Sequence, residues 1–135
     1  MIITEYRISL FFSAYNYDYF NGELPTPKFK VIHKKDTLGT CWCSWLSRKD
    51  AVISVTDKYI LTEEQFRNIL VHEMIHFYLA YTRKDMFCRH GKAFLEMMND
   101  FNNRYGLNIQ TFADLDEYEP AEEKGILGKI KDFLF

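Results

Sequence analysis

The sequence predicts an α+β domain with one hydrophobic core. Three observations support this fold class: an amphipathic helical segment comes first, three short β-rich segments follow, and two further helical segments come after them. This order of elements, with the strands grouped together between helices, suggests the α+β class. The length of 135 residues suits one core and is too short for two.

The first helix is predicted over residues 4–20, with Thr4 as its N-cap. Its apolar side chains fall on one stripe, which consists of Ile8, Phe11, Phe12, Tyr15 and Tyr19. The Asn21-Gly22 pair is expected to end this helix, and two nearby prolines keep the following chain extended.

Three strands are predicted, over residues 28–34, 39–46 and 51–57. The short connection between the last two favours an antiparallel hairpin, so we expect a three-stranded antiparallel or mixed sheet. In 51–57, Ser54 and Thr56 fall on one side of the strand. This alternation predicts an edge strand with a solvent-exposed face, along which a peptide could bind as an added strand.

Two more helices are predicted in the second half of the chain. Thr62 and Gln65 form a capping box that begins one helix, which runs to a loop at 83–89. The last helix spans about 91–105 and is expected to end at Gly106. Its apolar side carries Phe94, Met97, Met98, Phe101 and Tyr105.

The C-terminal part is predicted to be an appendage, giving a domain at 1–112 and a tail at 113–135. The tail begins with an acidic connector, and 126–134 has the pattern of a short amphipathic helix. Lysines lie opposite its apolar residues, so docking on a membrane surface or a partner is the alternative to packing on its own domain.

Composition excludes several classes of protein. No apolar segment is long enough to span a membrane, and the N-terminus does not resemble a signal peptide. The only cysteines are Cys41, Cys43 and Cys88, a number and spacing that indicate reduced thiols in a cytoplasmic protein. Cys41 and Cys43 should share one face of a strand and serve as small buried hydrophobes.

The segment that indicates chemistry is 69–81, an almost wholly apolar stretch that contains His72, Glu73 and His76. Burying these side chains without partners would cost several kcal/mol, and a bound metal removes that conflict. Histidines four apart share a helix face and suit two corners of a tetrahedral zinc site. Glu73 lies one step round the helix, where it can act on a water molecule at the metal as a general base.

A third metal ligand is expected, with the fourth position open for water. His90 is the first candidate, because it opens the next helix, whose N-terminus keeps an imidazole neutral. Glu96, Asp85 and Cys88 are alternatives. If Cys88 were a closing fourth ligand, the site would be structural, or the protease latent. His33 is predicted to be structural or surface-exposed.

Four stretches resemble the SprT-like family of zinc metallopeptidases, which includes the Spartan proteases. They are LVHEMIH at 70–76, RHGKAFLEMMNDFN at 89–102, YFNGELP at 19–25 and LGTCWC at 38–43. The resemblance covers about residues 1–112. It implies a small zincin-like fold, one Zn²⁺ held by His72, His76 and His90, and Glu73 as the catalytic base.

The resemblance also implies a zinc-dependent endopeptidase. Spartan-type relatives cleave proteins crosslinked to DNA, with DNA as activator, so DNA-associated proteins are candidate substrates. This sequence departs from the family in lacking a Cys-x-x-Cys zinc ribbon after the catalytic block. The alternative is a non-catalytic, zinc-stabilised module that binds DNA or a protein partner.

Two further sets of residues are candidates for supporting roles. The residues that could stabilise an oxyanion or support the metal ligands are Tyr78, Tyr81, Arg83 and Arg89, with packing or surface exposure as the alternative. The residues that could contact a DNA backbone are Lys28, Lys30, Lys34, Lys35, Arg48 and Lys49, within the basic stretch 24–49. Trp42 and Trp45 could stack on bases, although a solvated face with core tryptophans would give the same pattern. The overall net charge of −2 therefore combines a mildly basic domain with an acidic tail.

Overall fold

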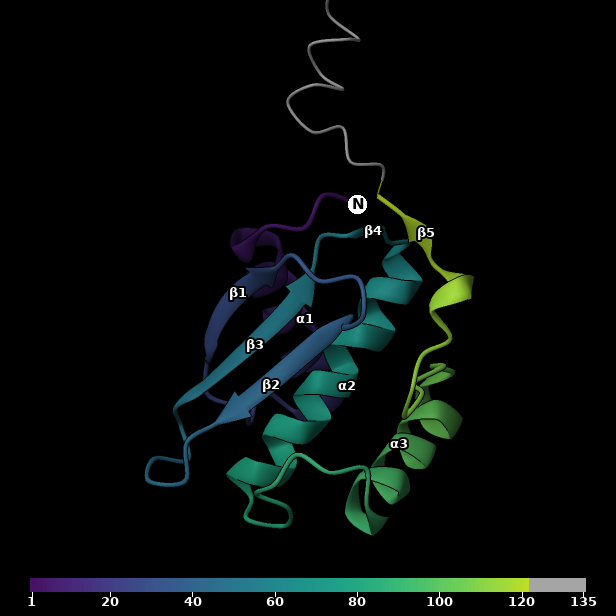
Figure 1. Ribbon diagram of the computed structural model, residues 1–135. Coiled ribbons are helices and arrows are strands. Elements are labelled where there is room, and N and C mark those ends of the chain that lie inside the picture. Colours follow the sequence, from purple (N-terminus) through teal and green to yellow (C-terminus); the bar gives the residue numbers. More distant parts are fainter. Residues whose placement is uncertain (122–135) are drawn as a thin grey trace, which may run out of the picture.

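The computed structural model describes residues 1–121 and shows an α+β arrangement of three α-helices and two small sheets (Figure 1). The elements in order are α1 (Glu5–Phe20), β1 (Lys28–Ile32), β2 (Gly39–Cys43), β3 (Ala51–Thr56), β4 (Tyr59–Ile60), α2 (Glu63–Tyr81), α3 (Lys92–Tyr105), the 3₁₀ turn η1 (Leu115–Glu117) and β5 (Glu119–Pro120). The helix predicted at 126–134 lies outside the described residues. Within 1–121, no helix has both the length and the apolar character needed to cross a membrane.

The three α-helices form where the sequence predicts them, with the predicted caps. The Thr4 hydroxyl accepts a hydrogen bond from the Arg7 backbone N–H at 3.0 Å. Both bonds of the capping box between Thr62 and Gln65 are present at the start of α2. Gly106 ends α3 in the left-handed conformation, with φ 65°.

The main sheet is mixed, with strand order β1-β3-β2. β2 and β3 form the predicted antiparallel hairpin, while β1 runs parallel to β3. The prediction of 51–57 as an edge strand is wrong, because β3 is the central strand. Ser54 and Thr56 are 3% and 0% exposed, and the Thr56 hydroxyl donates to the carbonyl of Lys34. The edges of the sheet are β1 and β2.

One face of this sheet packs on the helices. Phe29, Ile53 and Cys41 lie side by side across the three strands, and Phe29 contacts Phe12 of α1 with ring centroids 5.3 Å apart. Figure 1 shows α1 behind the strands, on this covered side. The opposite face carries the alternate residues, with Lys28, Val52 and Trp42 in one row and Lys30, Ser54 and Thr40 in the next.

Helix α2 is the centre of the core. Most of its side chains from residue 66 to residue 80 are buried, including Phe66, Leu70, Met74 and Phe77. The predicted apolar helix is therefore buried between the sheet and the other helices. Burial of this helix also buries two of its polar residues, Glu73 and His76.

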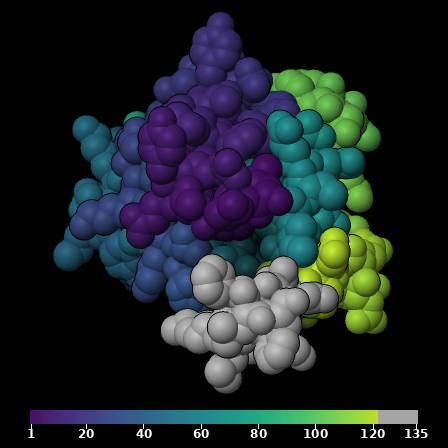
Figure 2. Space-filling model, turned by 90° about the horizontal axis from the view of Figure 1, so that it is seen from above, coloured from purple at the N-terminus to yellow at the C-terminus, as the bar shows by residue number. Residues whose placement is uncertain are grey.

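The chain after α3 folds back across α2. Leu107 and Ile109 are buried, and β5 pairs antiparallel with β4, so that Tyr59 lies opposite Pro120. This small second sheet has no counterpart among the predicted strands. Figure 2 views the molecule from above and shows the N-terminal residues beside those that begin α2, where the Met1 amine donates to the Leu61 carbonyl at 3.2 Å. The boundary proposed at residue 112 stays a prediction.

Candidate active site

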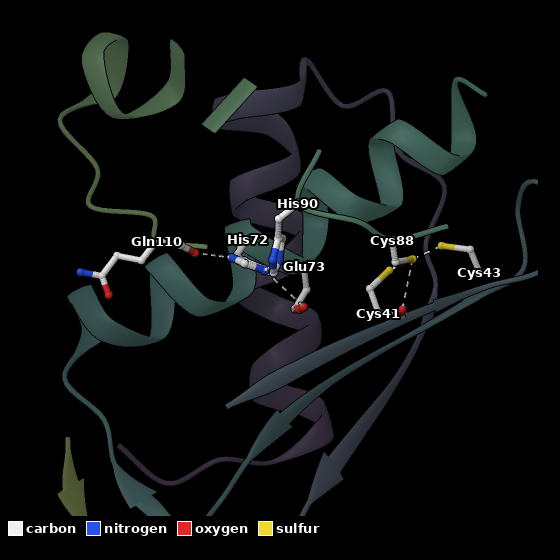
Figure 3. Close-up of polar contacts among 7 residues, drawn as sticks. All are labelled: Cys41, Cys43, His72, Glu73, Cys88, His90 and Gln110. Atoms are coloured by element: carbon white, nitrogen blue, oxygen red, sulfur yellow. Dashed lines mark hydrogen bonds and ion pairs between the residues drawn. The ribbon is translucent and has the colours of Figure 1, made fainter. Parts of the chain in front are cut away.

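Three histidines converge beside the sheet, and Figure 3 shows two of them, His72 and His90. His72 and His76 project from one face of α2, and His90 directly precedes Gly91, the N-cap of α3. Their ligand nitrogens lie within 4.8 Å of one another, and the Nε2 atoms of His72 and His90 are 3.1 Å apart. Two nitrogens bound to a tetrahedral zinc ion at about 2.0–2.1 Å would lie roughly 3.3–3.4 Å apart. The observed spacing therefore suits a shared cation.

The imidazoles are neutral near pH 7 in this environment. Burial, followed by the neighbouring His76, lowers the pKa of His72 to about 3. Burial also lowers the pKa of His76 to about 4 and shifts the pKa of His90 downward. Neutral rings keep a lone pair for a metal ion, and imidazole suits zinc among other transition metals.

A backbone carbonyl orients the first of these rings. Nδ1 of His72 donates to the carbonyl oxygen of Gln110 at 2.7 Å. Because a carbonyl only accepts, this bond leaves the lone pair of His72 on Nε2, the nitrogen that faces His90. Support of this kind for a ligand ring is typical of metal sites. Nothing in the sequence singles out Gln110, since every residue has a carbonyl.

Phe94 holds the three rings from one side. Its ring centroid lies 4.5 Å from that of His76, nearly parallel to it, and 4.8 Å from those of His72 and His90. Phe94 is completely buried in the first turns of α3. Phe94 comes four residues after His90 in the 89–102 stretch, and this spacing is the sequence signal from which its position could have been predicted.

Glu73 brings a buried carboxyl group to the same place. One of its oxygens, Oε1, lies 3.9 Å from Nε2 of His72. The other, Oε2, has no hydrogen-bond partner among residues 1–121, although the residue is only 5% exposed. Burial first, and then Cys88, raises the pKa of Glu73 to about 8. A buried and unpartnered carboxyl oxygen is costly, and such groups concentrate at functional sites.

Strand β2 forms the opposite wall of the site and needs a glycine there. A Cβ at Gly39 would lie 3.0 Å from Cγ2 of Ile69, 3.1 Å from Cγ of Glu73 and 3.1 Å from the Ser54 carbonyl. The strand can therefore approach α2 this closely only without a side chain. Gly39 belongs to the LGTCWC stretch identified in the sequence. The sequence did not show why a glycine is needed at this position.

An open pocket of about 490 Å³ connects these groups to solvent. Its walls are formed by β2 with the loop before it, by α2, and by the segment 110–118 that folds back over α2. Phe112 lies at its rim, with its ring edge-on to His90 at 5.1 Å. Asn68 and Tyr118 also line the pocket and were not among the predicted residues.

Comparison with known proteins identifies the family of this chain. A family model for the SprT-like family matches residues 8–113, which is most of the chain and includes the three histidines and Glu73. The chain belongs to the SprT-like family. No protein in a search of curated sequences matches it. The resemblance inferred from the sequence motifs is thereby confirmed.

The cysteines of this SprT-like domain form a separate cluster. The Sγ atoms of Cys41 and Cys43 are 3.5 Å apart, as expected for residues on one face of β2. Cys88 joins them, since all three sulfurs lie within 4.8 Å of one another and its thiol donates to the Cys41 carbonyl at 3.5 Å. Cys88, an alternative ligand in the sequence, thus sits with the other cysteines.

The tyrosines proposed as oxyanion donors do not line the pocket of this SprT-like domain. Tyr78 packs on Phe20, with ring centroids 5.7 Å apart, and Lys84 lies over its ring. Tyr81 lies under the guanidinium of Arg48. Both rings therefore pack against neighbouring side chains away from this pocket.

The arginines of the same set also lie outside the pocket lining. Arg83 donates to the Trp45 carbonyl at 3.4 Å. Arg89 pairs with Asp85 at 3.6 Å, and Asp85 in turn accepts from the Phe87 N–H. These contacts order the loop before α3. Of the other alternative ligands, Asp85 is engaged in this loop, and the exposed Glu96 pairs with Lys92 on α3.

The six basic residues proposed for DNA are all exposed, and none lines the pocket. Lys28 and Lys30 lie on β1, at the edge of the sheet away from β2, and share the uncovered sheet face with Trp42. Lys34 and Lys35 follow β1, and Arg48 and Lys49 lie in the β2–β3 turn. His33 is exposed and lies 2.7 Å from the Asp57 carboxylate, a surface position.

Proposed function

We propose that this SprT-like domain is a zinc-dependent endopeptidase. The observation that supports it best is the unpartnered, buried oxygen of Glu73 beside three converging neutral histidines. His72, His76 and His90 would hold one Zn²⁺ and leave its fourth position open to the pocket, the arrangement of catalytic rather than structural zinc sites. The three cysteines are free thiols, which fits the cytoplasmic location that we propose.

The protein residues perform the proton transfers in the proposed mechanism. Bound zinc supplies Lewis acidity, which acidifies a water molecule and polarises a peptide carbonyl. Glu73 takes the proton of the attacking water on its free Oε2 and then gives it to the leaving amine. His72 stays oriented by the Gln110 carbonyl throughout, and Phe94 keeps the three rings in place.

We propose that the substrate binds along β2. β2 is an edge strand that pairs only with β3 in the described part of the chain, so its outer side is available to an extended peptide. Gly39 and Cys41 of this strand line the pocket. The Cys88 thiol already bonds to the Cys41 carbonyl, which leaves the part of the edge nearer Gly39 open.

The test is the Glu73→Gln variant with zinc loading measured alongside cleavage of a denatured protein such as casein. Glutamine cannot accept a proton, so we expect zinc binding to persist and cleavage to fall by at least about 100-fold. The control is Glu64→Gln, an exposed position on the first turn of the same helix. Undiminished cleavage by Glu73→Gln would remove Glu73 as the base.

A second proposal is that the uncovered sheet face binds nucleic acid, so that proteins held on DNA become substrates. It is supported by the register that aligns the exposed side chains of Lys28 and Trp42 on this face, with the exposed Lys30 in the next row. Lysines neutralise phosphates and an exposed tryptophan can stack on a base. A zinc-stabilised binding module without turnover would use the same face.

This proposal is tested by titrating single- and double-stranded oligonucleotides over a range of salt concentrations. We expect Lys28→Glu with Lys30→Glu to weaken binding and to reduce the salt slope by about 1–2 units. The matched control reverses two charges on α3, Lys92→Glu with Arg104→Glu. If the protein shows no salt-dependent binding at low ionic strength, the nucleic-acid proposal is excluded.

A further inference from the structure

The three cysteines lie together next to the histidines without being part of their cluster. Two come from β2 and one from the loop before α3, and Figure 3 shows them grouped beside His90 and Glu73. Their sulfurs lie within 4.8 Å of one another, and the three histidine nitrogens form their own group. We propose that Cys41, Cys43 and Cys88 form a second metal site, for a thiophilic d¹⁰ cation such as Zn²⁺.

The sulfur spacing suits such an ion. Sulfurs bound to one cation at about 2.3 Å lie roughly 3.8–4.0 Å apart in tetrahedral or trigonal geometry. The observed Sγ–Sγ distance of 3.5 Å for Cys41 and Cys43, and the limit of 4.8 Å for all three pairs, bracket that value. Only small side-chain rotations are needed to bring the sulfurs to the required distances.

The two elements are shaped to bring the sulfurs together. Cys41 and Cys43 are two apart on a strand, so both point toward the helix side of the sheet. Cys88 has a positive φ of 51°, which is uncommon for a residue other than glycine. This backbone turn accompanies the contact of its thiol with the Cys41 carbonyl. The loop therefore adopts a disfavoured conformation where its sulfur meets β2.

A disulfide explains the cluster less well than a metal. The Cα atoms of residues two apart on a strand are separated by about 6.6–6.8 Å, the upper limit for a disulfide. Cys88 could pair with one of the other two, but the third sulfur would then be left beside the bond without a role. A metal uses all three, and thiolates select ions such as Zn²⁺ and Cu⁺. Cys41 and Cys88 also line the open pocket, which supplies an entry path.

The second site would act on the first through the chain. Cys88 precedes His90 by two residues, so an ion held by the three sulfurs ties the loop that carries His90 to β2. We therefore expect occupation of the sulfur site to hold His90 in place. This gives the cysteine cluster a role that is independent of whether the domain cleaves peptides.

The experiment measures metal content and metal spectroscopy on the whole chain kept reduced. After loading with Zn²⁺ and desalting, we expect two ions in the wild type. One ion should remain in Cys41→Ala with Cys43→Ala, and one in His72→Ala with His76→Ala. His33→Ala, the histidine outside both clusters, is the control and should keep two. Titration with Cd²⁺ should produce sulfur-to-metal charge-transfer absorption in the wild type and in the histidine variant, but not in the cysteine variant.

The Cd²⁺ spectrum of the wild type needs no variant, so the test survives a cysteine variant that fails to fold. A zinc content that is the same in the cysteine variant as in the wild type, or Cd²⁺ binding without sulfur absorption, would overturn the proposal. So would a thiol titration of unreduced protein that finds one thiol instead of three, because that indicates a disulfide. If the histidine variant instead binds as much zinc as the wild type, the proposed catalytic site fails. The Cd²⁺ absorption then still decides whether the sulfur site exists.

Discussion

At the scale of single residues, burial acts in opposite directions on the acid and the bases of the site. It raises the pKa of Glu73 and lowers the pKa values of His72 and His76, because each charged form is disfavoured away from water. Without a metal ion, the side chains of Glu73, His72 and His76 are therefore mostly uncharged near pH 7. A divalent cation would reverse the preference of Glu73, since it favours the carboxylate.

This opposition predicts how the stability of the metal-free protein depends on pH. The pKa of Glu73 is about 8 in the folded chain and near 4.5 when unfolded, so between these values the unfolded chain binds fewer protons. Raising the pH in this window then favours unfolding. Glu73→Gln has no carboxyl group to titrate. Its free energy of unfolding, relative to that of wild type, should therefore rise by roughly 1–3 kcal/mol as the pH increases from about 5.5 to 7.5.

The measurement is urea unfolding of chelator-treated wild type, Glu73→Gln and the control Glu64→Gln across this range. The histidines titrate in the opposite sense, since the unfolded chain gains their protons below about pH 6.5. Their contribution is common to all three proteins and cancels in the comparison. A stability difference between Glu73→Gln and wild type that does not change with pH would mean that Glu73 is ionised in the folded protein.

At the scale of elements, the site depends on how closely β2 approaches α2. Gly39 lies where a Cβ would press on Glu73, Ile69 and the Ser54 carbonyl. We expect Gly39→Ala to destabilise the protein by about 1–3 kcal/mol, because the strand must move away from the helix. The same displacement should lower peptidase activity, since it moves the Glu73 side chain.

Gly91→Ser is the matched control for this substitution. A Cβ at Gly91 meets nothing within 4 Å, and serine is a favoured N-cap for α3. Unfolding in urea should show unchanged or increased stability for Gly91→Ser. Equal stability of Gly39→Ala and wild type would show that the approach of β2 to α2 can relax at no cost.

The strand order shows what local patterns do not reveal. The alternation of Ser54 and Thr56 predicts an exposed face, yet both side chains are buried in the central strand. β3 runs antiparallel to β2 and lies between β2 and β1. It therefore pairs in parallel with β1, although β2 separates these two strands in the sequence. Hydrophobic alternation reports the periodicity of one strand, but not which strands lie beside it.

At the scale of the whole molecule, the returning segment after α3 completes the site. The Asn102 side chain accepts from the Ile109 N–H at 2.8 Å and donates to the Ile109 carbonyl at 3.0 Å. This pair of bonds fixes the backbone one residue before Gln110, whose carbonyl orients His72. Residues far apart in the chain thereby set the orientation of the His72 ring.

Removing this contact should therefore weaken metal binding at a distance. We expect Asn102→Ala to destabilise the protein by about 1–3 kcal/mol and to reduce zinc affinity at the histidine site by roughly 10-fold. The neighbouring and exposed Asn103→Ala serves as the control. Competition with a chromophoric chelator measures the affinity, and an affinity equal to that of wild type would show that the His72 ring holds its orientation without this support.

The sequence by itself predicted the elements whose cause is local. The caps at Thr4 and Thr62, the apolar stretch that forms α2 and the spacing of His72, Glu73 and His76 are all local features of the chain. For the same reason the motifs were enough to indicate the family, which the family match confirms.

Only the tertiary structure decided the features that depend on segments distant in sequence. These are the central place of β3, the carbonyl of Gln110 behind His72, the β4–β5 pair, and the meeting of Cys88 with Cys41 and Cys43. Each of these features brings together segments that are distant in the sequence, and the periodicity of apolar residues does not predict which distant segments meet. They form because burying one shared core brings these segments together, and a local sequence pattern contains no record of which neighbours that burial selects.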